Sequence, residues 1–251
     1  MRNILASNLM CVISLAACTL ACKKSSTSTT TTTSANVPEV YKKIYGASDM
    51  YISDNYVVIK TTSLPDHKSP YYQGTQWSAK YEAYNGANAN FTINPHRIAQ
   101  SALTFKIPLN PAVATVHSAT PMGAIGISLN GVPFFNQYAA GGAPLTGEIN
   151  SFDQYYGHPQ QQGMYHYHAE PFYLTTAKGK DAFLGFLLDG FPVYGPQENG
   201  QIITNAQLDT YHGHTSATTD YPNGIYHYHI TSTDPYLNGS GFYGTPGTVS
   251  Q

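Results

Sequence analysis

Cysteine is absent from the 251-residue sequence after position 22, because Cys11, Cys18 and Cys22 are its only cysteines. The rest of the chain can therefore form no disulfide bond, even in an oxidising compartment. It also offers no thiolate to act as a nucleophile or as a metal ligand. Any metal ion bound after position 22 has to be held by nitrogen and oxygen atoms.

Charged side chains are also scarce, at 10% of residues. Arg2, Lys23 and Lys24 precede position 37, so nine of the twelve Lys and Arg residues follow it, together with all fourteen Asp and Glu residues. This balance of −5, with no basic cluster, argues against a nucleic-acid partner. No stretch after the first 21 residues is apolar for long enough to span a bilayer.

Residues 1–22 have the pattern of a lipoprotein signal peptide, in which Arg2 is followed by an apolar stretch and by small residues before a cysteine. Cys18 and Cys22 both follow segments that resemble the bacterial lipobox, whose cysteine is lipidated and becomes the mature N-terminus. We favour Cys22, because a polar tether begins directly after it, and a cleaved signal without lipid is the alternative. The expected partner is a lipid bilayer, and the expected location is the cell envelope, as an outer-membrane or cell-surface lipoprotein secreted across the inner membrane.

Residues 23–36 form a Ser/Thr-rich linker that we expect to be disordered. Residues 37–251 have the composition of one globular domain. Tyr, Val, Ile, Phe and Thr are frequent in it, and Gly and Pro recur every few residues. This composition predicts a mainly β fold with few short helices, around Asn205–Thr210 and near Phe152–Tyr156.

The domain contains an internal duplication, with β-rich repeats at roughly residues 124–170 and 183–231. The matched blocks are Gly126–Phe135 with Gly185–Tyr194, Asp153–His158 with Asp209–His214, and Gly163–His168 with Gly224–His229. Asn130-Gly131 and Asp189-Gly190 predict two-residue hairpins, because both central positions tolerate a positive φ. We expect the two units to pack about a pseudo-twofold axis, which would bring equivalent residues together.

Each repeat ends on the tetrapeptide Tyr-His-Tyr-His, at Tyr165–His168 and at Tyr226–His229. On a β-strand both histidines face one side and both tyrosines the other. Imidazole is the commonest protein ligand for ions such as Zn and Cu. The candidate metal ligands are the histidines of these strands and of the two Gly-His pairs, namely His166, His168, His227, His229, His158 and His214. One shared site and two separate sites are both open, as is the choice between Zn and Cu.

Two aspartates accompany these histidines. Asp153 and Asp209 each lie five residues before a Gly-His histidine. They are candidate ligands or, more typically, acceptors that fix the tautomer of a ligating histidine. The alternative for the whole set is a hydrogen-bonded core of His and Tyr that holds no metal.

With these motifs the chain resembles the YHYH-domain proteins of bacteria. The resemblance covers nearly all of residues 50–247, and it rests on the doubled tetrapeptide, the Asn/Asp-Gly turns and the Gly-His pairs. It extends to the segments Leu64–His67, Ile107–Pro111, Thr120–Gly123 and Gly241–Pro246. It implies the same fold unit and makes His67 a further candidate metal ligand, but it implies no established activity, substrate or cofactor.

The chain departs from that family at four positions. Many members carry cysteine where this sequence has Tyr155, Tyr173, Tyr211 and Gly241, which suggests disulfides beside the histidines in those relatives. Here packing has to replace them, and cysteine cannot be a general part of the chemistry.

Three functions are compatible with the sequence. The first is a metal-binding domain, catalytic or not, in which a carboxylate such as Glu170 or Asp189 would do acid–base work. The second is an envelope module that binds glycans or another ligand through its aromatic side chains. The third is a two-histidine phosphoesterase, for which His229-Ile230-Thr231 fits the motif and His168-Ala169-Glu170 lacks the hydroxyl.

Overall fold

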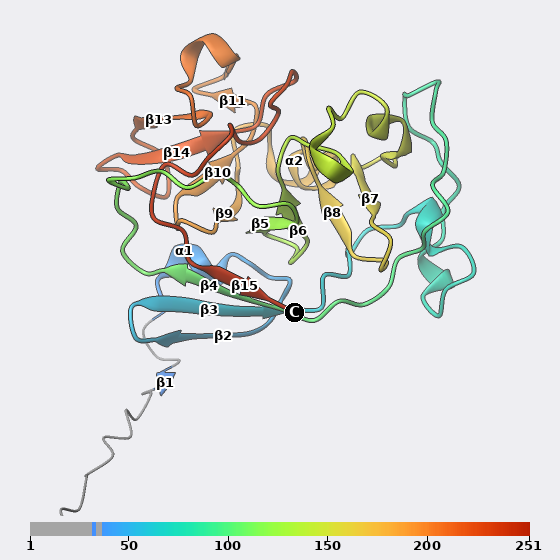
Figure 1. Cartoon of the computed structure of the whole chain (residues 1–251), viewed down its shortest axis with the longest axis horizontal. Coiled ribbons are helices and arrows are strands. Elements are labelled where there is room, and N and C mark those ends of the chain that lie inside the picture. Colours follow the sequence, from blue (N-terminus) through green and yellow to red (C-terminus); the bar gives the residue numbers. More distant parts are fainter. Residues whose placement is uncertain (1–31, 34–36) are drawn as a thin grey trace, which may run out of the picture. The chain divides into compact units, whose positions relative to one another are not determined.

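The computed structural model describes residues 32–33 and 37–251. The predicted signal peptide, the lipidation at Cys22 or Cys18, and all of the predicted linker except Thr32–Thr33 lie outside the described residues. In the part that is described, strands predominate over helices, so the prediction of a mainly β fold is confirmed (Figure 1). No helix among these residues has the length and apolarity needed to cross a membrane.

The larger of two main sheets has eight strands, all from the two sequence repeats, in the order β13-β14-β10-β9-β5-β6-β8-β7. The first repeat supplies β5 (Ala124–Ser128), β6 (Pro133–Phe135), β7 (Gly157–Pro159) and β8 (Tyr165–Tyr167). The second supplies β9 (Phe183–Leu187), β10 (Pro192–Tyr194), β13 (Gly213–Ser216) and β14 (Ile225–His229).

Strand order in this sheet is the same outward from its middle on both sides. β5 and β9 pair antiparallel at the centre, and each is followed by its hairpin partner, then by the Tyr-His-Tyr-His strand, then by the Gly-His strand. The hairpin partners β6 and β10 pair parallel with β8 and β14. A pseudo-twofold relation would require this order, and the relation itself stays a prediction. The two Tyr-His-Tyr-His strands are separated by four others, so the sheet does not bring them together.

The second main sheet has five strands in the order β1-β2-β3-β4-β15. These are β1 (Thr32–Thr33), β2 (Ala47–Ser53), β3 (Tyr56–Thr61), β4 (Leu103–Pro108) and β15 (Thr248–Ser250). The short helix α1 (Glu39–Lys42) connects the two sheets, because Tyr41 stacks on Phe186 of β9 at 4.0 Å and donates a hydrogen bond to the carbonyl oxygen of Pro108 on β4. Their apolar residues belong to one buried core.

The remaining elements are short. They are the hairpin β11 (Gln197–Glu198) and β12 (Gln201–Ile202), the helix α2 (Phe172–Lys178), and the 3₁₀ turns η2 (Pro70–Tyr72), η3 (Ser78–Lys80), η4 (Ala140–Gly142), η5 (Glu148–Ser151) and η6 (Asn205–Gln207). The helix expected at Asn205–Thr210 is therefore one 3₁₀ turn. The helix expected near Phe152–Tyr156 is absent, because the chain turns there and Tyr156 has φ +63°.

Both predicted hairpins exist, but each loop has three residues instead of two. Ser128 N–H donates to Val132 O and Leu187 N–H to Phe191 O, and only Gly131 and Gly190 of the loops have positive φ. This is the loop in which a tight turn is followed by a left-handed residue. Asn130 and Asp189 are buried and hydrogen-bonded to tyrosine hydroxyls, which explains why these side chains point inward.

Candidate metal centres

The first group of histidines is formed by β7, β8 and the residue that follows β8. His158 lies directly opposite His166 in the antiparallel register of β7 and β8. His168 lies two residues after His166 and therefore on the same face. The Nε2 atom of His166 is 3.0 Å from that of His158 and 2.9 Å from that of His168. The predicted division of the strand into a histidine face and a tyrosine face is confirmed.

The outer nitrogen of each ring in this group faces a hydrogen-bond acceptor. His166 Nδ1 lies 3.1 Å from the carbonyl oxygen of Met164, and His168 Nδ1 lies 2.5 Å from that of Asn136. His158 Nδ1 lies 2.7 Å from Ser151 Oγ, whose own hydrogen is donated to the carbonyl oxygen of Glu148. Because a carbonyl oxygen can only accept, the Nδ1 atoms of His166 and His168 carry the hydrogen, and their Nε2 atoms present lone pairs. His158 Nδ1 also faces the amide nitrogen of Asn94, a donor, so its contacts do not fix its tautomer.

The lone pairs of His166 and His168 face each other at 2.9 Å and form no hydrogen bond, because neither Nε2 atom carries a hydrogen. A proton could bridge them, but burial is the main cause that lowers the pKa of His158 and of His166 well below the usual value. A metal ion could be bound by the three Nε2 atoms of the group at once, because four ligands at 2.0–2.1 Å in a tetrahedron are spaced at about 3.3 Å. The first group is positioned to bind a metal ion.

The second group repeats this geometry on β13 and β14. His214 lies opposite His227 in the register of these strands. The Nε2 atom of His227 is 3.2 Å from that of His214 and 3.1 Å from that of His229. His227 Nδ1 faces the carbonyl oxygen of Ile225 at 3.0 Å, and His229 Nδ1 faces that of Gly195 at 2.8 Å. The lone pairs of His227 and His229 are therefore also directed into the group.

A glutamate that the sequence patterns did not single out lies beside each group. Glu148 Oε1 is 3.4 Å from His158 Nε2. Glu198 Oε2 is 3.5 Å from His214 Nε2, and its Oε1 is 3.7 Å from His227 Nε2. Glu198 completes a set of four donors that lie within 4.8 Å of one another. Each glutamate lies between the hairpin and the Gly-His pair of its repeat, which is the only sequence signal that could have found it.

The two groups differ in exposure and charge. The side chain of His158 is 3% exposed and that of His214 is 24% exposed. Burial raises the pKa of Glu148. Burial also acts to raise the pKa of Glu198, but the Ser216 hydroxyl and the neighbouring imidazoles outweigh it and hold that pKa below the usual value. Burial lowers the pKa of His168 and of His229 to about 4.

The other candidate site residues lie elsewhere. His67 is buried outside both groups, where its Nε2 is 3.1 Å from the hydroxyl of Tyr167. Asp153 accepts a hydrogen bond from Tyr165 and Asp209 accepts one from Tyr226, each at 2.9 Å. These contacts place both aspartates on the tyrosine side of the strands and not behind the candidate ligand histidines, where they were expected. The carbonyl oxygens of Asn136 and Gly195 orient His168 and His229 instead. These two residues lie 59 positions apart in the sequence.

Comparison with protein families agrees with the motifs. The sequence model of the family described as YHYH protein matches residues 104–202 and 197–241, which is more than half of the chain. The chain belongs to the YHYH protein family. No curated protein and no solved structure matches it.

The four positions at which the resemblance suggests cysteine in other members lie in two neighbouring pairs in this structure. The rings of Tyr155 and Tyr173 meet edge to face with centroids 5.4 Å apart. A Cβ atom placed on Gly241 would be 3.7 Å from the ring of Tyr211. Aromatic packing thus occupies the places where this YHYH protein lacks cysteine.

The carboxylates that the sequence offered for acid–base work are engaged in the framework. Glu170 pairs with Lys180 and accepts a hydrogen bond from Thr175. Asp189 accepts hydrogen bonds from the hydroxyl of Tyr228 and the backbone of Gly244. Thr231, the hydroxyl of the His-x-Thr motif, is bonded to His212 and to the carbonyl oxygen of Thr233.

Proposed function

We propose that this protein binds two divalent transition-metal ions, Zn or Cu, one at each group of three histidines. The observation that carries the proposal is the direction of the Nε2 lone pairs in the first group. Backbone carbonyls fix the hydrogens of His166 and His168 on Nδ1, so one cation bound between the two facing Nε2 atoms would accept both lone pairs. Because cysteine is absent from the domain, the donor set consists of imidazole nitrogen and carboxylate oxygen, which suits Zn and Cu.

A metal-free network of His and Tyr is the main alternative. The tyrosine side of the strands has such a network, since the hydroxyls of Tyr165, Tyr226 and Tyr228 all donate to aspartates. The histidine side differs, because its rings turn their acceptor atoms toward one another. These three tyrosines are buried and cannot stack on a sugar, so a glycan-binding module would have to use exposed tyrosines such as Tyr45 and Tyr81.

Calorimetric titration of the purified, chelator-treated protein with Zn or Cu tests the proposal. We expect two ions per chain, and one ion after either His166→Ala or His227→Ala. His117→Ala is the matched control, because His117 lies outside both groups and stacks on Tyr211. The proposal would be ruled out if the protein bound no ion, or if the number of bound ions per chain were unchanged in both variants.

We also propose that the protein works in the cell envelope, held at a bilayer by a lipid on Cys22. The support is the signal-like sequence of residues 1–22 and the Ser/Thr-rich tether after it. Mass spectrometry of the mature N-terminal peptide distinguishes an acylated Cys22 from an acylated Cys18 and from an unmodified terminus.

A further inference from the structure

Each group of histidines opens on a cavity of its own. The first group adjoins a cavity of about 520 Å³, and the second adjoins one of about 930 Å³. Two histidines and the nearby glutamate line the cavity in both cases, namely His166, His168 and Glu148 at the first group and His227, His229 and Glu198 at the second. The two groups are therefore alike in their imidazole and carboxylate donors, and the residues around these donors have to account for any difference in the ion that they select.

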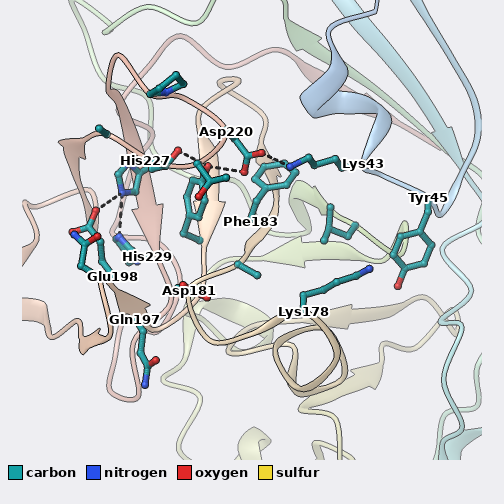
Figure 2. A pocket seen from close by; sticks show the side chains of 18 residues that line it. Lys43, Tyr45, Lys178, Asp181, Phe183, Gln197, Glu198, Asp220, His227 and His229 are labelled. Carbon is teal, nitrogen blue, oxygen red and sulfur yellow. Dashed lines mark hydrogen bonds and ion pairs between the residues drawn. The ribbon is translucent and has the colours of Figure 1, made fainter.

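Methionine distinguishes the surroundings of the first group. Met122 and Met164 both line the smaller cavity, whereas the described residues that line the larger one include no methionine. In the duplicated sequence Met164 corresponds to Ile225, one residue before Tyr-His-Tyr-His. Met122 corresponds to Asp181, each four residues before the first matched block of its repeat, and Asp181 lines the larger cavity (Figure 2). The same two positions thus carry two thioethers in one repeat, and a carboxylate and an alkyl chain in the other.

We infer that the first group is a site for copper(I), to which Met122 and Met164 offer thioether sulfur beside the three imidazoles, and that the second group prefers divalent ions. This inference rests on the proposed metal binding and assigns a class of ion to each group. Thioether sulfur is a soft donor that selects copper(I), whereas carboxylate oxygen suits harder ions. The absence of cysteine excludes thiolate ligands from the domain, but thioether sulfur remains. The divalent ions of the proposed function need only nitrogen and oxygen, so sulfur takes part when the ion is copper(I).

Both methionines lie next to residues that orient the histidines. Met164 precedes His166 by two residues, so it belongs to the histidine face of the chain, and its carbonyl oxygen faces His166 Nδ1 at 3.1 Å. The sulfur of Met122 is 3.9 Å from the side-chain nitrogen of Asn136, whose carbonyl oxygen faces His168 Nδ1. A methionine side chain has three rotatable bonds, so small rotations let its sulfur follow an ion that enters the group.

The walls around the first group favour an ion of low charge. The ring of Phe135 stacks on His166 with centroids 3.9 Å apart, whereas the corresponding residue of the second repeat is Tyr194, whose hydroxyl donates to Asp220. Among the described residues that line the smaller cavity, Glu148 is the one acidic or basic side chain besides the histidines. The cost of moving an ion from water into an apolar site rises with the square of its charge. A copper(I) ion beside a single carboxylate leaves no net charge, whereas a dication leaves an uncompensated positive charge between apolar walls.

Copper(I) affinity, measured without oxygen by competition with the chelator bicinchoninate, tests the inference. With one equivalent of copper(I), we expect the ion at the first group, so His166→Ala should weaken the binding and His227→Ala should leave it unchanged. The double variant Met122→Leu/Met164→Leu should weaken it by about 10-fold or more, because even outer-shell partners typically contribute about 10–100-fold to metal affinity.

Leucine has nearly the volume of methionine, so the double variant removes the sulfur atoms and keeps the packing. Its zinc affinity and its stoichiometry of two zinc ions per chain should match those of the unchanged protein. Met50→Leu is the matched control, because Met50 lies on β2 of the five-stranded sheet. X-ray absorption of the protein with one equivalent of copper(I) should show a sulfur neighbour that is lost in the double variant and absent from the zinc-loaded protein.

The outcomes separate this inference from the metal-binding proposal. A protein that holds two zinc ions but whose copper(I) affinity is the same in the double variant overturns the inference and leaves the metal binding intact. Copper(I) binding that is lost with His227→Ala and kept with His166→Ala also overturns it, as does an equal fall in copper(I) and zinc affinity in the double variant, because the methionines would then act through the fold. Failure to bind any of these ions overturns the proposed function itself.

Discussion

The Nε2 atoms of His166 and His168 lie 2.9 Å apart although the Nδ1 atom of each ring faces a backbone carbonyl oxygen. Two neutral imidazoles that face each other normally share one hydrogen. Here each ring donates its one N–H hydrogen to a backbone carbonyl oxygen, so the contact between the two Nε2 atoms is unfavourable until a cation enters. The free energy of folding that holds the rings in place would therefore prepare the site for the cation of the proposed metal binding.

Acid should release the metal only far below the ordinary pKa of histidine. A ligating imidazole must be neutral, and burial lowers the pKa of His168 and His229 to about 4, below the usual 6.5. Protons therefore compete with the metal only as the pH approaches 4. Bound metal measured after dialysis at successive pH values should persist to about pH 5. Release centred near pH 6.5, as for an exposed hexahistidine peptide, would contradict this account.

The metal-free protein should lose stability as the pH falls below about 6.5. The unfolded chain takes up protons on its histidines there, while the folded chain does not, so unfolding is favoured by about 1.4 kcal/mol per histidine and pH unit. Asp189 acts in the opposite direction, because burial raises its pKa to about 6 and its contribution to stability is lost as the pH rises from 3.8. Histidines with a lowered pKa outnumber carboxyls with a raised one: His67, His158, His166, His168, His212, His227 and His229 against Glu148, Asp153 and Asp189. Urea unfolding at pH 7 and pH 5 checks the sign.

Ser151→Ala should weaken the first site and leave the second unchanged. The substitution removes the hydroxyl that lies 2.7 Å from His158 Nδ1 and orients this ring. The loss of such orienting partners typically costs 10–100-fold in metal affinity, so about 10-fold or more is expected here. Competition with a chelator resolves the two binding steps. A change of equal size at both sites would show that Ser151 acts on the fold and not on His158.

Asp153→Asn should lower stability without changing the number of bound ions. Asp153 is buried and accepts hydrogen bonds from Ser69 and Tyr165 at 2.6 Å and 2.9 Å. An amide accepts through only one of its two polar atoms, so at least one donor is left without its partner at a cost of about 1–3 kcal/mol. Denaturant unfolding measures the cost, and metal titration should still give two ions per chain. If the variant bound only one ion, Asp153 would support the first group directly.

Period-two patterning made much of this structure predictable. Alternation in Tyr165–His168 and Tyr226–His229 places all the histidines on one face, because successive strand residues point to opposite sides. The duplicated Gly-His pairs supply a third imidazole in each repeat. The pattern could not predict the order of the strands in the sheet. That order separates the candidate ligands into two groups.

The residues that sequence reasoning missed lack a periodic signal. Glu148 and Glu198 reach their groups from a 3₁₀ turn and a small hairpin, whose directions depend on tertiary packing. The carbonyl oxygens of Asn136 and Gly195 carry no side-chain signature at all. The helix Phe172–Lys178 did have a sequence signal, because Pro171 precedes it and Gly179 follows it. Its aromatic and β-branched residues, however, are typical of a strand.

X-ray absorption at the metal edge of the protein loaded with two equivalents of Zn or Cu tests the central claim most directly. We predict nitrogen or oxygen ligands at about 2.0–2.1 Å, with the outer-shell scattering of three imidazole rings per ion and no sulfur. A spectrum of oxygen ligands without imidazole scattering, or one left unchanged when His166 and His227 are both replaced by alanine, would contradict it.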